Sequence, residues 1–236
     1  MPGYYYYGFD PTYILVIIGL FLCLGASAMV KSTMSKYSKV QNGSRITGAE
    51  AARRILNNEG LYDVQIECLQ KEEGDHYDPR TNTVRLSYNN YHTASVTSVG
   101  VAAHECGHAI QHAKGYAPLN LRSAMVPVVN IGNRLSMPLI LLGILLSWNQ
   151  TLIGIGIWAF SLSVLFYLVT LPVELNASRR AIVKVEEYGI LSHQENSGCK
   201  KVLTAAALTY VAAAASVILQ LLRLILLYGG NRRRRD

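Results

Sequence analysis

Residues 101–110 read Val101-Ala102-Ala103-His104-Glu105-Cys106-Gly107-His108-Ala109-Ile110, which places two imidazoles four positions apart with a carboxylate beside the first. In an α-helix, His104 and His108 would lie on one face, one turn apart, where both can bind a single metal ion. Glu105 could then reach a water at that metal. This is the His-Glu-x-x-His pattern of a zinc hydrolase. The alternative is a pair of ordinary core or surface histidines on a helix.

The surroundings of this motif favour a buried helix. From Ala94 to Ala113 the sequence contains no proline, and apolar residues recur at helical spacing. The middle residue of the motif, Cys106, would point to the opposite side of that helix from the two histidines, so we predict a small core residue rather than a metal ligand there.

The composition indicates a membrane protein. Of 236 residues, 50% are hydrophobic and only 16% are charged, which is below the usual quarter in soluble proteins. Thr12 to Val30 is uncharged over a length that can cross a bilayer. Tyr4 to Tyr7 precede this run and Tyr13 lies at its start, and tyrosine favours the membrane interface. We therefore predict a first transmembrane helix there.

Two further apolar runs extend the membrane part. Leu135 to Val173 is long enough for two passes with a polar break at Trp148-Asn149-Gln150, and its first arm is predicted to start near Val126, with Arg134 snorkelling or facing protein. Val202 to Tyr228 is alanine-rich and then leucine-rich, and its small residues suit close helix packing in lipid.

The distribution of basic residues predicts the orientation. Segment 31–125 holds eleven Lys and Arg and segment 172–201 holds five, whereas positions 149–150 hold none, so both basic segments should face the cytoplasm. The tail with Arg232 to Arg235 would then lie outside, unless the last apolar block is re-entrant or interfacial. The predicted parts are 1–30 with the first membrane helix, 31–125 as a zinc-binding domain, 126–173 as a membrane hairpin, 174–201 as a second cytoplasmic segment, 202–228 as a fourth membrane helix, and 229–236 as a basic tail.

The segment between the first two membrane regions should mix helix and strand. Thr47-Gly48-Ala49-Glu50 is a capping box that opens a helix ending at Gly60. Val64 to Leu69 and Thr83 to Ser87 alternate as strands, joined by a polar turn that contains Asp78-Pro79-Arg80. The strand just before the motif helix could add an extended substrate to its edge, or the two strands could form a plain hairpin.

A catalytic zinc site needs a third protein ligand. His112 is two turns from His104 and too far along the helix to share its metal. Glu174 is the better candidate, because it is the first charge after the membrane hairpin, where the chain returns to the side of the motif. The alternative is an interfacial carboxylate paired with Arg179 or Arg180.

Four stretches of this chain together resemble the YugP-like membrane zinc metallopeptidases of bacteria: Asp75-His76-Tyr77-Asp78-Pro79-Arg80, Val84-Arg85-Leu86-Ser87, residues 102–111 around the motif, and Glu174-Leu175-Asn176-Ala177-Ser178-Arg179-Arg180-Ala181. That family is similar to heat-shock membrane proteases and prenyl-protein endopeptidases, in which a distal glutamate is the third ligand and an aspartate four residues later orients a ligand histidine. The resemblance implies that Glu174 is the ligand here. The aspartate position is Ser178, whose hydroxyl polarises an imidazole less than a carboxylate does. A bacterial inner membrane is implied as well.

These features together predict a mainly α, polytopic α-helical membrane protein with a small α+β, zincin-like zinc domain facing the cytoplasm. Zn²⁺ on His104, His108 and Glu174 would activate water, Glu105 would accept its proton, and His76 or Tyr88 could stabilise the oxyanion. The expected substrate is a peptide or a membrane protein, the expected surroundings are the lipid bilayer with a possible membrane-protein partner or oligomer, and no nucleic acid is expected. The alternatives are a membrane adaptor or scaffold that keeps a zinc site without turnover, and a lipid-binding or scaffolding protein whose histidines merely pack.

Overall fold

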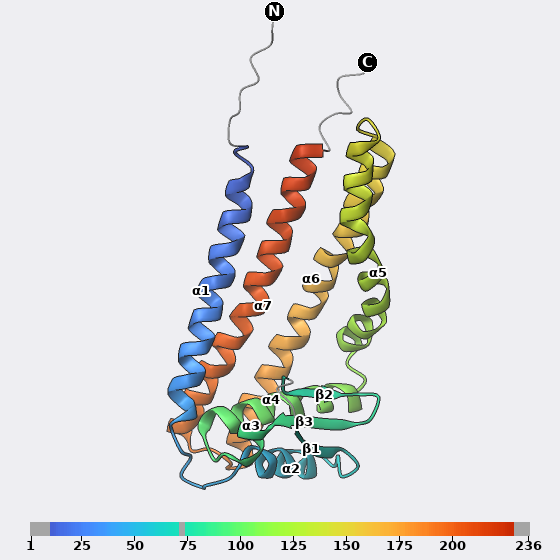
Figure 1. Ribbon diagram of the computed structural model, residues 1–236. Helices are drawn as coiled ribbons and strands as arrows, with labels where there is room; N and C mark the ends of the chain where they lie inside the picture. The colour runs from blue at the N-terminus through green and yellow to red at the C-terminus, as the bar shows by residue number, and fades with distance from the viewer. Residues whose placement is uncertain (1–9, 71–73, 229–236) are drawn as a thin grey trace, which may run out of the picture. The chain divides into compact units, whose positions relative to one another are not determined.

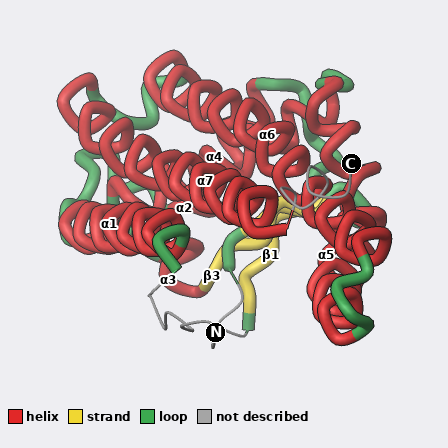
Figure 2. The backbone as a smooth tube through the Cα atoms, turned by 90° about the horizontal axis from the view of Figure 1, so that it is seen from above, coloured by secondary structure: helices red, strands yellow, loops and turns green. Residues whose placement is uncertain are grey.

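The computed structural model describes residues 10–70 and 74–228 and consists mainly of helices (Figure 1). Four of them are long and apolar enough to cross a membrane: α1 (Tyr13–Ser38), α5 (Ala117–Leu145), α6 (Gln150–Glu187) and α7 (His193–Tyr228). The strands form only a small part of the molecule (Figure 2). The prediction of a helical chain with four candidate membrane spans is thus confirmed. Tyr4 to Tyr7 and the basic tail 229–236 lie outside the described residues.

The predicted membrane hairpin is formed by α5 and α6. The chain reverses at Ser147 and Trp148, which both have positive φ, and the side chain of Asn149 accepts hydrogen bonds from the amides of Thr151 and Leu152 at the start of α6. The polar break therefore works as a helix stop followed by a cap. Helix α5 begins at Ala117, well before the predicted start near Val126, and Arg134 is exposed on it.

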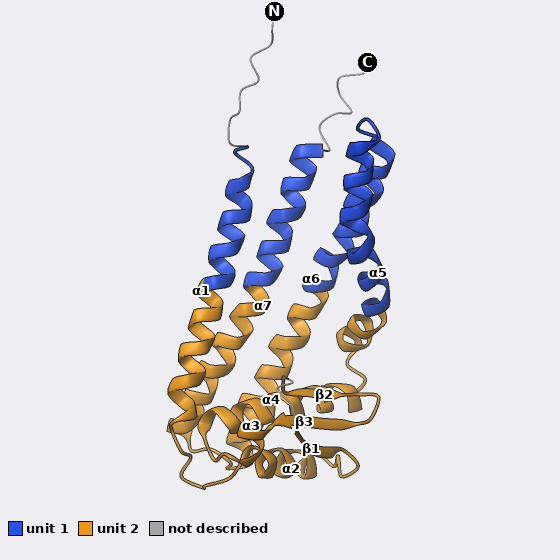
Figure 3. Cartoon of the chain, in the orientation of Figure 1, with its two compact units in different colours: residues 1–24, 125–167, 212–236 blue, residues 25–124, 168–211 orange. Residues whose placement is uncertain are grey.

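The long helices pass through two compact units (Figure 3). One unit holds residues 1–24, 125–167 and 212–236, and the other holds 25–124 and 168–211. Residues 174–201, predicted as a cytoplasmic segment, are the end of α6, a turn with positive φ at Gly189, and the start of α7. The second unit therefore brings the motif helix and one end of each of the four long helices into one body.

The predicted capping box is present at α2 (Gly48–Asn58). The hydroxyl of Thr47 accepts from the amide of Glu50, and the carboxylate of Glu50 accepts from the amide of Thr47. This reciprocal pair satisfies amides that have no partner within the helix. The helix buries Ala51, Ala52, Ile55 and Leu56 against α4 (Val96–Ala113), which makes the centre of the hydrophobic core.

The sheet differs from the predicted pair of strands. Its order is β1-β3-β2, in which β1 (Gln65–Leu69) runs parallel to β3 (Thr83–Ser87) and β2 (His76–Asp78) is antiparallel to β3. The hairpin alternative for β1 and β3 is therefore wrong, because an additional strand intervenes and the turn after Asp78 joins β2 to β3. Substrate addition to the strand before the motif is wrong as well, because β3 is central and both of its edges are paired. The short helix α3 (Tyr88–His92) follows β3 directly.

A buried carboxylate ties α2 to two other helices. Glu59, whose side chain is only 6% exposed, accepts bonds from Lys184 of α6 at 2.7 Å, from Lys114 just after α4 at 3.0 Å, and from the hydroxyl of Tyr188 at 2.7 Å. Burial acts to raise the pKa of Glu59, but these three donors outweigh burial and lower the pKa from 4.5 to about 2.

This shift predicts that Glu59→Gln destabilises the protein by about 1–3 kcal/mol at neutral pH. Because the pKa is lower in the folded state, the stabilisation is present above pH ~4.5 and is lost as the pH falls toward ~2. Thermal unfolding in detergent should show this pH dependence for the wild type and a weaker one for the variant. Glu67→Gln, at an exposed carboxylate paired with Arg85, is the control. Equal stability of the Glu59 variant and this control would contradict the assignment.

Candidate metal centre

The motif lies on α4, as the helical surroundings predicted, and this helix begins at Val96. Ser95 caps it by accepting a hydrogen bond from the amide of Ser98. The rings of His104 and His108 lie on one face with their centroids 4.8 Å apart. The local helix thus delivers the two imidazoles to one place, as their spacing requires.

A close helix contact brings a carboxylate to these imidazoles. A Cβ atom on Gly107 would lie 2.6 Å from the carbonyl oxygen of Ala177, so only glycine allows α4 to approach α6 this closely. Glu174 lies one turn earlier on α6, and its side chain is 3% exposed. Its Oε2 lies 3.3 Å from Nε2 of His104 and 3.4 Å from Nε2 of His108. The structure thus brings together the three side chains that the sequence predicted as ligands.

The chemistry of this group fits a zinc ion. One ligand atom from each of the three side chains lies within 4.8 Å of the others, and Oε2 of Glu174 is buried without a hydrogen-bond partner. Nδ1 of His108 lies 3.0 Å from Oε1 of Gln111, and Nδ1 of His104 lies 3.2 Å from the hydroxyl of Ser178. An amide oxygen can only accept, so the proton of His108 belongs on Nδ1, and Nε2 is left with its lone pair toward Glu174. Two nitrogens and one carboxylate oxygen are the donor set of a catalytic zinc site with an open position.

The supporting role of Gln111 was missed by sequence reasoning. Its side chain is fully buried, and its Nε2 donates to the carbonyl oxygen of Val173 at 2.8 Å and to Oδ1 of Asn176 at 3.0 Å. The same amide therefore orients His108 and holds the part of α6 that carries Glu174. A polar residue three positions after the second histidine, on the same helix face, was the available signal.

The alternative interpretation, in which Glu174 pairs with Arg179 or Arg180, is wrong. The guanidinium of Arg122, from α5, lies 3.6 Å from Oε1 of Glu174. Arg180 instead donates to Asn176, and Arg179 is exposed. The helical path of α6 explains this, since neither arginine shares the face of Glu174.

Glu105 lies in the cavity beside this group. It is 7% exposed and lines a cavity of about 180 Å³ together with His104, Ser178, Asp75 and Tyr210. Burial raises the pKa of the Glu105 carboxyl above its ordinary value, although the two histidines oppose this effect. Tyr210 reaches this cavity from α7. The cavity therefore holds a carboxylate and a phenol next to the group of converging ligand atoms.

The rest of the cavity wall is apolar. Met34 of α1, Val101 of α4 and Val202, Leu203, Ala206 and Ala207 of α7 line it. Ala206 and Ala207 are small, so they leave room beside His104 and Glu105 in this cavity. With Ser178 of α6, three helices long enough to cross a membrane thus contribute directly to the walls of this cavity.

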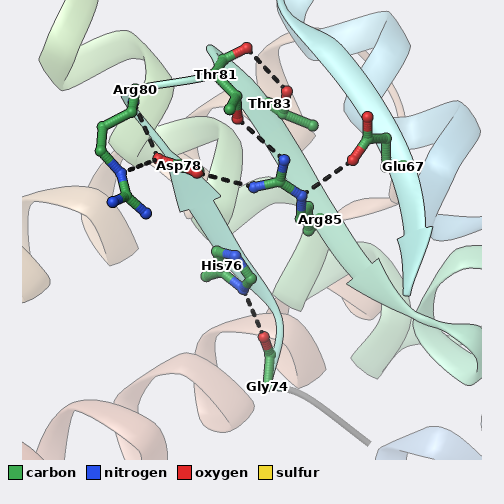
Figure 4. A network of polar contacts seen from close by, with 8 residues as sticks. All are labelled: Glu67, Gly74, His76, Asp78, Arg80, Thr81, Thr83 and Arg85. Atoms are coloured by element: carbon green, nitrogen blue, oxygen red, sulfur yellow. Dashed lines mark hydrogen bonds and ion pairs between the residues drawn. The ribbon is translucent and has the colours of Figure 1, made fainter. Parts of the chain in front are cut away.

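The other predicted site residues lie elsewhere. His76 lies on β2, where its Nδ1 bonds the carbonyl oxygen of Gly74 near the Asp78–Arg85 ion pair (Figure 4). Tyr88 is 67% exposed and packs against His92. Neither lines the cavity of Glu105 as the described residues define it.

Two further side chains occupy the places that the helix geometry predicted. His112 bonds the hydroxyl of Tyr77 at 2.8 Å and does not belong to the group of ligand atoms. Cys106 is fully buried against α2, where its thiol contacts the carbonyl oxygen of Ala52. Burial raises the pKa of the Cys106 thiol, which suits an inert core residue.

Comparisons with known proteins agree with this geometry. A sequence model of the family described as "Putative neutral zinc metallopeptidase" matches residues 12–229. The chain is also 48% identical over 197 residues to "Putative membrane protease YugP" of Bacillus subtilis (strain 168). The matched region covers 84% of this chain and 87% of that protein. No solved structure matches the chain significantly. The chain belongs to this neutral zinc metallopeptidase family.

Proposed function

We propose that this chain is a membrane-embedded zinc metallopeptidase that hydrolyses peptide bonds at a site facing the cytoplasm. The observation that carries the proposal is the position of Glu105, which shares one small cavity with His104 and adjoins the converging ligand atoms of His108 and Glu174. A structural zinc site has four protein ligands and no need for such a neighbour. A buried carboxylate next to three ligands is the arrangement that hydrolysis needs.

In the proposed hydrolysis, the zinc ion and the protein side chains have separate roles. Zinc held by His104, His108 and Glu174 would supply a Lewis acid that polarises the peptide carbonyl and lowers the pKa of a water. Glu105 accepts the proton of the attacking water and then donates it to the leaving nitrogen. Gln111 keeps His108 in the tautomer that leaves Nε2 free.

Tyr210 is our candidate for stabilising the carbonyl oxygen as negative charge develops on it. The hydroxyl is a hydrogen-bond donor in the same cavity as Glu105, whereas His76 and Tyr88 do not line that cavity. In a second role, the phenol would position the proposed ligand Glu174. The two roles differ in what they do to zinc binding.

For Tyr210→Phe we expect kcat to fall about 100-fold, with zinc content and KM unchanged, because loss of one oxyanion donor typically costs that much. Steady-state cleavage and metal analysis of the purified variant measure both quantities. Tyr167→Phe, at a tyrosine on α6 outside the cavity, is the control. A drop in zinc affinity with little change in the kcat of zinc-loaded protein would instead make Tyr210 a positioning residue.

The walls of the cavity suggest the substrate class. Small and apolar side chains of α7 face the catalytic groups, and they would accept a small or apolar substrate side chain close to the scissile bond. Because α1 and α7 are membrane-spanning candidates, we propose that the substrate is a peptide segment near the membrane surface, such as the end of a membrane protein's helix.

The orientation rests on charge. The basic segments 31–125 and 172–201 hold eleven and five Lys and Arg, and both contribute to the unit that carries the site. Since basic segments remain in the cytoplasm, we propose that the metal centre faces that side of a bacterial inner membrane. Thiol labelling of Lys114→Cys in intact and permeabilised cells would test this, and labelling in intact cells would contradict it.

The function itself is tested by metal removal. Purified protein in detergent should cleave casein or a helical membrane-protein substrate, lose this activity on chelation, and regain it with about one equivalent of Zn²⁺. If the chelated protein still unfolds cooperatively on heating, the loss of activity is not caused by denaturation. Stoichiometric zinc without cleavage of any tested substrate would overturn the proposal.

That last outcome would favour a second candidate function. A membrane adaptor that keeps a zinc site without turnover is favoured by one observation, the hydroxyl of Ser178 beside Nδ1 of His104 at a position where related proteases have an aspartate. A hydroxyl makes a weaker hydrogen bond to the imidazole than a carboxylate does. Measured turnover decides between the two functions.

A further inference from the structure

A groove between the end of α1 and the start of α7 lies apart from the metal centre and has a volume of about 580 Å³. The helices meet closely just below it, since a Cβ on Gly198 would lie 2.7 Å from the ring of Tyr37. A close contact between the two helices therefore bounds the groove on this side.

Three lysines line this groove: Lys36 from α1 and Lys200 and Lys201 from α7. All three are exposed, and among the described residues none of them forms an ion pair with a carboxylate within 4 Å. The carboxylate of Glu195, in the adjoining pocket, accepts hydrogen bonds from the amides of Gly43 and Ser192. The positive charge of the groove is thus available for an anion.

The groove has an apolar side as well as a cationic one. Met29 and Ala205 line it, together with the hydroxyls of Ser32, Thr33, Ser197 and Thr204. The hydroxyl of Ser32 donates to the carbonyl oxygen of Met29, so the other three hydroxyls supply the hydrogen-bond donors beside the lysines. One end of the groove thus suits a phosphate, and the other suits a hydrocarbon chain.

The position of the groove along both helices points to the membrane surface. The uncharged run of α1 ends at Val30 and that of α7 begins at Val202, so the lysines lie just past the ends of both runs. At this level a membrane protein meets the headgroups, while Met29 and Ala205 lie at the hydrocarbon edge. A basic pocket between membrane helices at this level matches the headgroups of anionic lipids.

We propose that this groove binds an anionic phospholipid, with the headgroup phosphate between the lysines and an acyl chain along the apolar side. The proposal does not depend on peptidase activity, because none of the lining residues belongs to the metal centre. Bound lipid would join the ends of α1 and α7 that also supply Met34 and Val202 to the catalytic cavity.

The test compares two double variants of equal charge in the full chain. Lys36→Gln/Lys201→Gln removes two groove lysines, and Lys31→Gln/Lys39→Gln removes two lysines of the same segment that do not line the groove. Each purified protein is mixed with phosphatidylglycerol or phosphatidylcholine in detergent micelles, and bound lipid is counted by native mass spectrometry. We expect the wild type to retain phosphatidylglycerol selectively and the groove variant to bind it at least about tenfold more weakly. The control variant should resemble the wild type.

One further variant and one competing ligand complete the test of lipid binding. Lys36→Arg/Lys201→Arg keeps the charge and should keep the lipid, which separates lost charge from lost folding. Inorganic phosphate should compete only weakly, because it lacks the acyl chain. Equal loss in the two glutamine variants would overturn the proposal, as would unchanged binding in the groove variant. If inorganic phosphate at the same concentration as the lipid displaced all of the bound phosphatidylglycerol, the groove would be a site for soluble phosphate. That result would also overturn the proposal.

Discussion

Glu105→Gln should abolish peptide hydrolysis while leaving zinc bound. The amide has nearly the size of the carboxylate but cannot accept a proton from water, and His104, His108 and Glu174 keep their ligand atoms. We expect turnover to fall by at least about 100-fold, the usual contribution of a general acid–base group. Cleavage assays on the zinc-loaded variant measure this effect.

The matched control for this variant is Glu187→Gln, at a half-exposed carboxylate of α6 that pairs with Lys184. It should retain both zinc and activity. Substantial activity of Glu105→Gln would contradict the role of Glu105, and loss of zinc from it would show that the substitution disturbs the ligands instead. The adaptor hypothesis predicts no difference between the two variants.

Glu174→Ala should reduce zinc affinity steeply and eliminate activity, because it removes one of the three proposed protein ligands. It would also leave the guanidinium of Arg122 without its carboxylate, 3.6 Å away in the wild type. We expect affinity to fall by at least about 100-fold. Competition with a zinc-binding dye and metal analysis of the purified protein measure the effect.

Two variants sharpen this result. Glu187→Ala removes an exposed carboxylate from the same helix and should change neither zinc content nor activity. Arg122→Gln keeps Glu174 and should reduce zinc affinity far less than Glu174→Ala, since it removes a partner rather than a ligand. Equal zinc content in the variants at 174 and 187 would remove Glu174 from the metal centre.

Much of the helical framework was predictable because membrane helices have a strong local signal. An uncharged run of bilayer length has few alternatives to a helix, and the break at Trp148-Asn149-Gln150 contains a side chain that can cap the next helix. The capping box of Thr47 and Glu50 and the spacing of His104 and His108 are equally local, since each is contained within two turns.

The sheet was harder to predict from the sequence. β2 contains only His76, Tyr77 and Asp78, too few residues for an alternating pattern, and its presence turns an expected hairpin into a parallel pair of β1 and β3 with a third strand. Strand pairing depends on contacts between segments that are separated in sequence, and it leaves little trace within either strand.

The sequence by itself determined the membrane helices, the motif helix and the candidate ligands His104, His108 and Glu174, because their spacing and hydrophobicity act over short range or match a known family. Only the tertiary structure decided what surrounds them. The contact of Gly107 with Ala177 sets the distance between α4 and α6, and Gln111 connects the two helices. Tyr210 reaches the cavity from α7. These contacts join residues far apart in the chain, and packing of side chains against one another, rather than any local pattern, specifies them.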